Sequence, residues 1–163
     1  MINLIKHKIQ DWDTAQRTLA GWRLAGSTVV FTNGCFDLIH PGHLHYLAEA
    51  RALGQHLVIG LNADESVSRL KGPHRPIKAQ AARALLLASL SFVDLVVLFT
   101  EDTPLRLIQH LQPDILVKGG DYTIETVVGA PEVLSWGGEV KLLSFLPGYS
   151  SSAIEEKILS SKQ

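Results

Sequence analysis

The hydrophobic positions of the chain gather in five short runs that are almost continuous and do not alternate with polar residues. Each run is rich in Val, Ile and Leu, as expected of a strand that is buried on both faces of a sheet. The runs cover residues 27–33, 56–62, 93–99, 113–119 and 139–145. They predict a five-stranded parallel sheet.

The segments between these runs have helical character. Helices are expected over 41–54, 64–70, 78–90, 103–111 and 130–136, with an opening helix over 11–24 and a closing helix from 151 to 159. Thr103 is the expected cap of its helix, with Pro104 in the first turn. Strands that alternate with helices over short connections predict a single doubly wound α/β domain over 1–163, with a core at 27–145 and a C-terminal helical segment at 148–163.

The most unusual residues follow three of the predicted strands. Asn33 and Gly34 end the first strand, "KGGDY" (118–122) ends the fourth, and "PGYSSS" (147–152) follows the fifth. In sheets of this kind, ligands bind beyond the carboxyl ends of the strands, where the strand order reverses. The sequence therefore predicts a binding site at this edge, close to the loop "KGPHRPIK" (71–78).

Composition narrows the function classes. The 163 residues are 46% hydrophobic and carry a net charge of −1, so no global positive field attracts nucleic acid or an anionic membrane. No apolar run approaches the length of about 18 residues that a membrane span requires. Charged residues interrupt the N-terminus too early for a secretory signal. The single cysteine excludes an internal disulfide framework and favours a cytoplasmic location.

The segment "FTNGCFDLIHPGHLHYL" (31–47) leads from the first strand into the first core helix. Pro41 suits the first turn of a helix, and Gly42 would let a phosphate approach the backbone N–H groups there. His40 and His43 lie three residues apart, so both rings can face one point at the helix start. This arrangement favours an oxyanion whose charge grows during a reaction.

Two other interpretations of this segment stay open on the residues alone. The histidines can simply cap and cover the helix, with His45 on the surface. A zinc site that uses Cys35 with His40, His43 or His45 lacks the usual ligand spacing. Cys35 itself is expected to be a small packed residue, since no base lies near it in the sequence.

Four blocks, in order, carry a resemblance to a known family. "GCFDLIHPGHLHYL" resembles the H-x-G-H signature of cytidylyltransferase-like nucleotidyltransferases. Together, "FTNGCFDLIHPGH", "RLKGPHRPI", "VDLVVLFTEDTPLRLI" and "PDILVKGGDY" resemble the adenylyltransferases that make ADP-heptose from heptose 1-phosphate. The likeness runs from about residue 11 to residue 159.

The resemblance implies roles for individual residues. His40, His43 and Lys71 would be catalytic, and the lysine would stand between the two phosphate groups. Nucleotide-binding positions would be Thr32, Asn33, Gly34, Phe36, Asp37, Gly42, Lys118, Gly119, Ser150, Ser151 and Ser152. Substrate-binding positions would be Asp37, Arg75, Arg83, Gly120 and Asp121. Apart from the resemblance, Arg83 is expected on a helix surface and Lys71 in a solvated loop. For Asp121 two interpretations stay open: it holds a sugar hydroxyl or a water of Mg²⁺, or it closes an Asx turn.

The closing segment "GYSSSAIEEKI" (148–158) departs from the family pattern. Relatives carry threonines where Ser151 and Ser152 stand, and a basic residue at the position of Glu156. Lys157 is then left alone to supply positive charge. The contacts to ATP that the family pattern implies for this helix are therefore not carried by matching residues, and one of its serines can simply be an N-cap.

The implied reaction joins ATP to D-glycero-D-manno-heptose 1-phosphate, giving ADP-heptose and pyrophosphate for lipopolysaccharide or another surface glycan. Mg²⁺ would enter with ATP, and no protein metal site is implied. The alternatives are a cytidylyltransferase acting on glycerol 3-phosphate or another small phosphate ester, and a catalytically silent nucleotide-binding module. The resemblance further implies a homodimer or higher homo-oligomer. Bifunctional relatives add a sugar kinase domain, so a separate kinase is expected here.

Overall fold

The computed structural model describes residues 1–144 and 146–161. Its centre is a six-stranded, wholly parallel sheet with the order β1-β4-β3-β2-β5-β6. The strands are β1 (Ile9–Gln10), β2 (Val29–Gly34), β3 (His56–Asn62), β4 (Leu95–Phe99), β5 (Ile115–Gly119) and β6 (Glu139–Leu143). The predicted α/β class with a parallel sheet is confirmed. Position 145 of the last predicted strand, and 162–163 of the closing segment, lie outside the described residues.

The predicted number of five strands is wrong, because β1 adds a sixth at the sheet edge. Ile9 pairs with Val96 and Gln10 with Val97 of β4. Two residues are too few to show a strand pattern in the sequence, and only the neighbouring β4 holds them extended.

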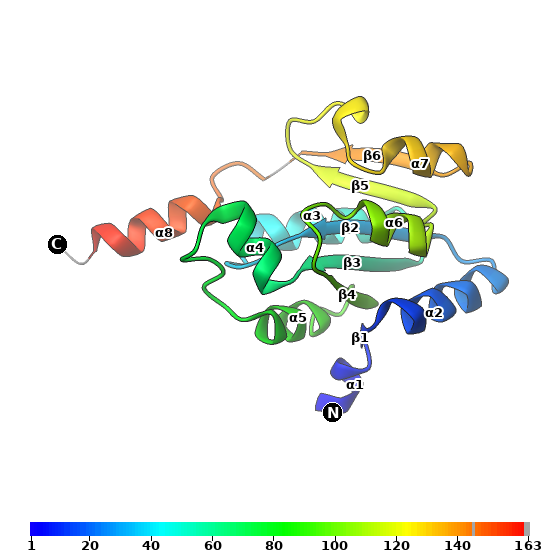
Figure 1. Ribbon diagram of the computed structural model, residues 1–163, viewed down its shortest axis with the longest axis horizontal. Coiled ribbons are helices and arrows are strands. Elements are labelled where there is room, and N and C mark those ends of the chain that lie inside the picture. The colour runs from blue at the N-terminus through cyan, green and yellow to red at the C-terminus, as the bar shows by residue number, and fades with distance from the viewer. Residues whose placement is uncertain (145, 162–163) are drawn as a thin grey trace.

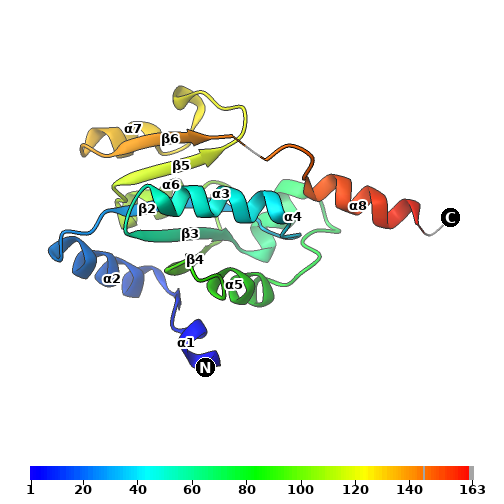
Figure 2. The same ribbon diagram turned by 180° about the vertical axis from the view of Figure 1, so that it is seen from behind.

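Helices cover both faces of the sheet (Figures 1 and 2). They are α1 (Ile2–Lys6), α2 (Trp12–Leu24), α3 (Pro41–Ala52), α4 (Asp64–Lys71), α5 (Gln80–Ala88), α6 (Leu105–Leu111), the 3₁₀ helix η1 (Ile124–Thr126), α7 (Ala130–Ser135) and α8 (Ser151–Ser160). Core side chains of α2, α6 and α7 pack together on one face, and those of α3 and α5 on the other. Along β2, Phe31 joins the first core and Val30 the second. This explains why the strands read as continuous apolar runs.

Two local expectations about helix ends are wrong. α6 begins at Leu105 with Pro104 as its N-cap residue, so Thr103 does not cap it. Lys71 is the last residue of α4 and does not lie in the loop that follows. That helix ends at Gly72, whose φ of 99° is the left-handed conformation that only glycine adopts without strain.

The strand order reverses beside β2. From β2 the chain moves to β3 and β4 on one side, and then crosses to β5 and β6 on the other. Helix α8 projects from the body near the carboxyl ends of the strands (Figures 1 and 2). Along the described ranges, no helix combines the length and apolarity that would let it cross a membrane.

Candidate functional site

Two adjoining cavities open at the carboxyl ends of the strands beside β2. The histidine pocket, of about 220 Å³, is lined by residues 33–37, His43, Tyr46, Lys71, 118–119, Tyr122 and Ser151. The second pocket, of about 470 Å³, is lined by 33–35, Asn62, 70–71, 102–104, Lys118, Tyr122 and 126–128. The pockets share the strand-end residues 33–35, both lysines and Tyr122. These shared residues (33–35, Lys71, Lys118 and Tyr122) form the common wall, at which two ligands bound in the two pockets would meet.

The histidine pair stands at the start of α3, as the sequence predicts. His40 is the N-cap residue with extended backbone, and its carbonyl accepts a hydrogen bond from the N–H of His43 at 2.9 Å. The two rings are stacked with centroids 3.8 Å apart. Only His43 lines the histidine pocket, because His40 lies behind it on the side of Tyr149. The expectation that both rings face one ligand is therefore wrong for this conformation.

Close packing holds the His43 ring in place. Phe36 meets it edge-on with centroids 5.3 Å apart, and does so from a left-handed backbone with φ of 47°. A Cβ at Gly42 would lie 3.0 Å from the His40 ring and 3.1 Å from Cβ of Tyr149. A side chain at position 42 would therefore crowd both neighbours, so Gly42 serves the packing of α3 in addition to any role near phosphate.

His43 is neutral in this conformation at neutral pH. Burial, followed by the neighbouring His40 and Lys71, lowers its pKa to about 4. Burial also lowers the pKa of His40. The Nδ1 atoms of both rings are buried, and neither has a hydrogen-bond partner among the residues that the structure describes. A neutral imidazole can still donate one N–H to a phosphate oxygen.

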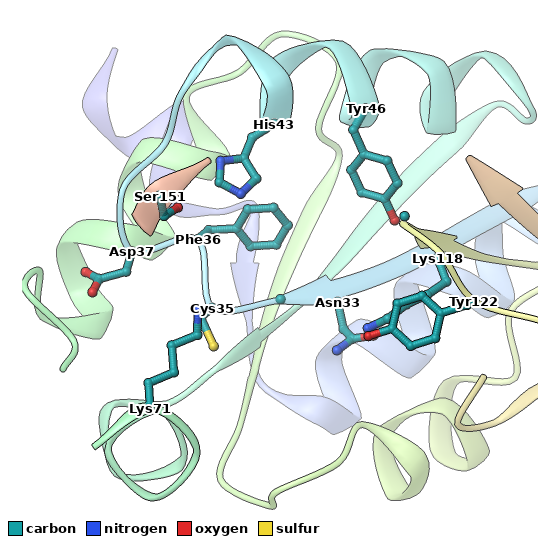
Figure 3. A pocket seen from close by; sticks show the side chains of 12 residues that line it. Asn33, Cys35, Phe36, Asp37, His43, Tyr46, Lys71, Lys118, Tyr122 and Ser151 are labelled. Atoms are coloured by element: carbon teal, nitrogen blue, oxygen red, sulfur yellow. The ribbon is translucent and has the colours of Figure 1, made fainter. Parts of the chain in front are cut away.

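Two lysines supply the positive charge of the common wall. Lys71 comes from the end of α4 and Lys118 from the end of β5. Figure 3 shows Lys118 beside Asn33 and Tyr122, across the pocket from His43, and its Nζ lies 5.3 Å from the centroid of the Tyr122 ring. Burial lowers the pKa of Lys118. Over the described ranges, neither lysine forms an ion pair with an acid, so both are available to an anionic ligand.

Asp37 is a structural anchor as well as a pocket residue. Its carboxylate accepts hydrogen bonds from the N–H groups of Ile77 and Lys78 and pairs with Arg75 at 2.8 Å. Burial opposes the charge of Asp37, but these contacts outweigh it and lower its pKa. Arg75 in turn pairs with Glu155 of α8 at 2.7 Å. The predicted substrate residues Asp37 and Arg75 thus connect the 72–79 loop to the loop that follows β2 and to α8.

Arg83 is fully buried, so the expectation of a helix-surface arginine is wrong. Its guanidinium donates to the carbonyls of Lys78, Cys35 and Asn62 and pairs with Asp64 at 2.7 Å. It joins the ends of β2 and β3 to the start of α5. With no exposed surface, Arg83 can act on a substrate only through the loops that it holds.

Thr32 is also buried, with its hydroxyl 2.5 Å from the hydroxyl of Tyr46. Ser151 lines the histidine pocket and donates to the carbonyl of Leu38, while Ser150 caps α8 through the N–H of Ala153. Nine predicted positions line neither pocket: Thr32, His40, Gly42, Arg75, Arg83, Gly120, Asp121, Ser150 and Ser152. No group of three His, Cys, Asp or Glu side chains suited to a metal ion occurs in the described part of the chain.

Sequence reasoning missed several residues of the site. Cys35 is partly exposed and lines both pockets, although it was expected to be packed, and burial raises the pKa of its thiol. Tyr46, Asn62, Tyr122 and the segments 102–104 and 126–128 were not predicted either. Asn62 had a usable signal, because it ends β3 as Asn33 lies near the end of β2. Tyr46, 102–104 and Tyr122 lie inside sequence segments already singled out, although no role was assigned to them, whereas 126–128 lie outside those segments.

Comparison with known proteins shows which family has a sequence similar to that of this chain. Residues 31–157 match the family described as cytidylyltransferase-like. The chain belongs to this family. The matched range holds the whole histidine pocket and second pocket, and the resemblance carried by the four sequence blocks is confirmed. The chain thus carries a nucleotidyltransferase domain.

Curated relatives are similar over most of this chain. It is 57% identical over 145 residues to the bifunctional protein HldE of Caulobacter vibrioides, and 56% identical over 153 residues to that of Acidiphilium cryptum. These matches cover 89% and 94% of this chain but 30% and 32% of the relatives. The chain therefore spans about a third of the length of these relatives.

A solved structure supports the fold. The crystal structure of the lipopolysaccharide core biosynthesis protein from Thermoplasma volcanium superposes with a TM-score of 0.59 and 30% identity. The superposition covers 74% of this chain and 98% of that one.

Proposed function

We propose that this chain transfers the adenylyl group of ATP to D-glycero-D-manno-heptose 1-phosphate, giving ADP-heptose and pyrophosphate. The observation that carries the proposal is the common wall, where two pockets share two lysines that have no acidic partner in the described structure. Such a wall suits a reaction between two polyanions, whose repulsion is large unless cations lie between them.

In the proposed reaction, ATP occupies the histidine pocket and the sugar phosphate occupies the second pocket. An oxygen of the sugar phosphate attacks the α-phosphorus of ATP in line, and pyrophosphate leaves. The attacking phosphate is already ionised, so no general base is required. Catalysis then depends on positioning and on stabilising the growing charge, which His43 would do by donating an N–H. Lys71 and Lys118 would hold the two phosphates together.

Mg²⁺ enters this proposal as part of the MgATP substrate. The carboxylate nearest the histidine pocket, Asp37, is already occupied by two N–H groups and Arg75. The described residues therefore offer no carboxylate cluster for the ion, and phosphate oxygens and water would hold it.

The choice of heptose and ATP is supported by relatives. The four sequence blocks resemble the ADP-heptose enzymes, and the solved structure similar to this chain is that of a lipopolysaccharide core biosynthesis protein. A role in making precursors of lipopolysaccharide or another surface glycan follows as part of the same proposal.

The test is a mass-spectrometric screen of ATP and CTP against heptose 1-phosphate, mannose 1-phosphate and glycerol 3-phosphate. We expect ADP-heptose and pyrophosphate, with much less product from CTP. Turnover of CTP with glycerol 3-phosphate, and none with a sugar phosphate, would reject the proposal. Binding of ATP without turnover of any acceptor would identify a silent nucleotide-binding module.

A further inference from the structure

The second pocket has a rim that the nucleotide does not account for. Its floor is formed by Asn62 at the end of β3, and its outer wall by residues 102–104, which follow β4. On the opposite side, 126–128 come from the end of η1. These segments line only the second pocket, His43 lines only the histidine pocket, and the two lysines line both. The segments would therefore contact the part of the second reactant that extends away from its phosphate.

The surface of this pocket combines aliphatic and hydrogen-bonding groups. Leu70, Pro104, Val127 and Val128 provide apolar contacts, while Asn62, Asp102, Thr103 and Thr126 provide polar ones. A small phosphate ester would leave most of this surface unused. A sugar matches it, because a pyranose ring offers C–H groups on its faces and hydroxyl groups on its edge.

Asp102 lies on the rim with 60% of its side chain exposed, and an ion pair with Arg69 orients it. Its Oδ1 accepts a hydrogen bond from Nε of Arg69 at 2.7 Å, and Arg69 also donates to the carbonyl of Thr100. The second carboxylate oxygen has no hydrogen-bond partner within the described ranges. A carboxylate fixed by one oxygen can accept hydroxyl groups with the other, without first being ordered by the ligand.

The floor is anchored to the same rim. Nδ2 of Asn62 donates to Oγ of Ser66 at 2.9 Å, and that hydroxyl donates to the carbonyl of Glu101 at 2.8 Å. The end of β3 and the segment before Asp102 are thus joined through α4. Asn62 is 3% exposed, and its side-chain carbonyl accepts no bond from the described part of the chain.

We propose that the second pocket binds the sugar of the acceptor, with Asp102 as the residue that recognises its hydroxyl groups and favours a sugar phosphate over a smaller phosphate ester. This inference rests on the proposed function, because it takes the phosphate to lie at Lys71 and Lys118. Thr103 adds a second hydroxyl contact next to Asp102. Asn62 closes the floor below the sugar.

The first experiment is steady-state kinetics of Asp102→Asn, which keeps the acceptor for Arg69 but removes the charge. We expect the KM for heptose 1-phosphate to rise about tenfold or more, as for loss of a hydrogen bond to a charged group, with the KM for ATP changed less than about twofold. Thr103→Val should raise the same KM by a smaller factor. Glu65→Gln is the matched control, because Glu65 is an exposed acid of α4 that lines neither pocket.

An Asp102→Asn variant with the sugar KM of the Glu65→Gln control would overturn the inference. So would a KM for ATP that rises in parallel with that for the sugar, since Asp102 would then act on the whole site. A variant that loses discrimination between heptose 1-phosphate and glycerol 3-phosphate supports it.

Titration calorimetry separates this inference from the proposed function. If the wild-type chain turns over no sugar phosphate, the proposed function fails, and binding of heptose 1-phosphate, mannose 1-phosphate and glycerol 3-phosphate decides the inference. Tighter binding of a sugar phosphate that weakens about tenfold in Asp102→Asn supports it. Absence of sugar phosphate binding, or equal binding by both proteins, overturns it.

Discussion

At the scale of single residues, the site depends on how burial sets the charge of each side chain. His43 is neutral because burial and two neighbouring basic groups disfavour its protonation. Lys71 and Lys118 have no acidic partner among the described residues, whereas Asp37 is fully occupied. The pocket wall is therefore locally positive in a chain whose net charge is −1.

His43→Ala tests the role of the imidazole. If its N–H meets charge that develops in the transition state, the maximal rate should fall by about 10²–10⁴, or roughly 3–5 kcal/mol, with a smaller change in ATP affinity. His45→Ala is the control, since His45 is exposed and pairs with Glu49. A His43→Ala protein with a lower melting temperature and an unchanged rate would make this histidine a packing residue.

The pKa of His43 also predicts how stability depends on pH. The folded pKa of about 4 lies below the ordinary histidine value of 6.5, so the unfolded chain binds more protons between these values. The free energy of unfolding should therefore fall as the pH drops from about 6.5 toward about 4. Urea titrations at several pH values measure this slope. The slope should be shallower in His43→Gln, and an equal slope in both proteins would contradict the assignment.

Lys71 is tested by two substitutions. Lys71→Ala should depress the rate strongly with little change in melting temperature, and Lys71→Arg should restore it only in part, because a planar guanidinium does not replace a point charge between phosphates. Lys6→Ala is the control, because Lys6 is also the exposed last residue of a helix, α1. A Lys71→Ala rate within about threefold of wild type, a change in activation free energy under ~0.7 kcal/mol, would mean that Lys71 is a solvated side chain with no role in the reaction.

At the scale of elements, the site is assembled by contacts between loops that are distant in the sequence. Arg83 holds the ends of β2 and β3, and Asp37 holds the 72–79 loop. Arg75 extends this connection to α8 through Glu155. The loops beside the pockets and α8 therefore belong to one connected framework, even though α8 projects from the body (Figure 2).

Asp37→Asn should break this framework. The amide cannot replace a carboxylate that accepts two N–H groups, and Arg75 loses its most buried partner, so the free energy of unfolding should fall by about 3 kcal/mol. Chemical denaturation measures the loss, and limited proteolysis should cut the 72–79 loop faster. Asp13→Asn, at an exposed acid, is the control. Unchanged stability with a lost rate would instead mean that Asp37 acts on the ligand directly.

At the scale of the whole molecule, the two-sided core explains where the site can form. Helices cover both faces of the sheet, so its faces are closed to ligands. Both pockets open at the carboxyl edge, where the reversal of strand order beside β2 leaves a crevice. The pockets on the two sides of this crevice give the molecule room for two reactants.

Local sequence determined the features that depend on neighbouring residues. Apolar runs predicted five of the strands, because strands buried on both faces need apolar side chains at every position. Pro41 and Gly42 predicted the start of α3, and strand ends predicted that Asn33, Gly34 and Lys118 lie at the ligand edge. His43 and Lys71 were found through their sequence blocks. The six-stranded count was not predictable, because β1 is held extended by β4.

Only the tertiary structure decided which side chains reach the ligand and which support others. Arg83 and Thr32 are buried because residues from distant segments cover them. His40 stacks on His43 and does not line the pocket. Residues 102–104 and 126–128 both line the second pocket, because the order of the strands brings together segments that are separated in the sequence. The exposure and the pKa of each pocket side chain depend on residues that are distant in the sequence. The spacing of residues along the chain therefore does not predict them.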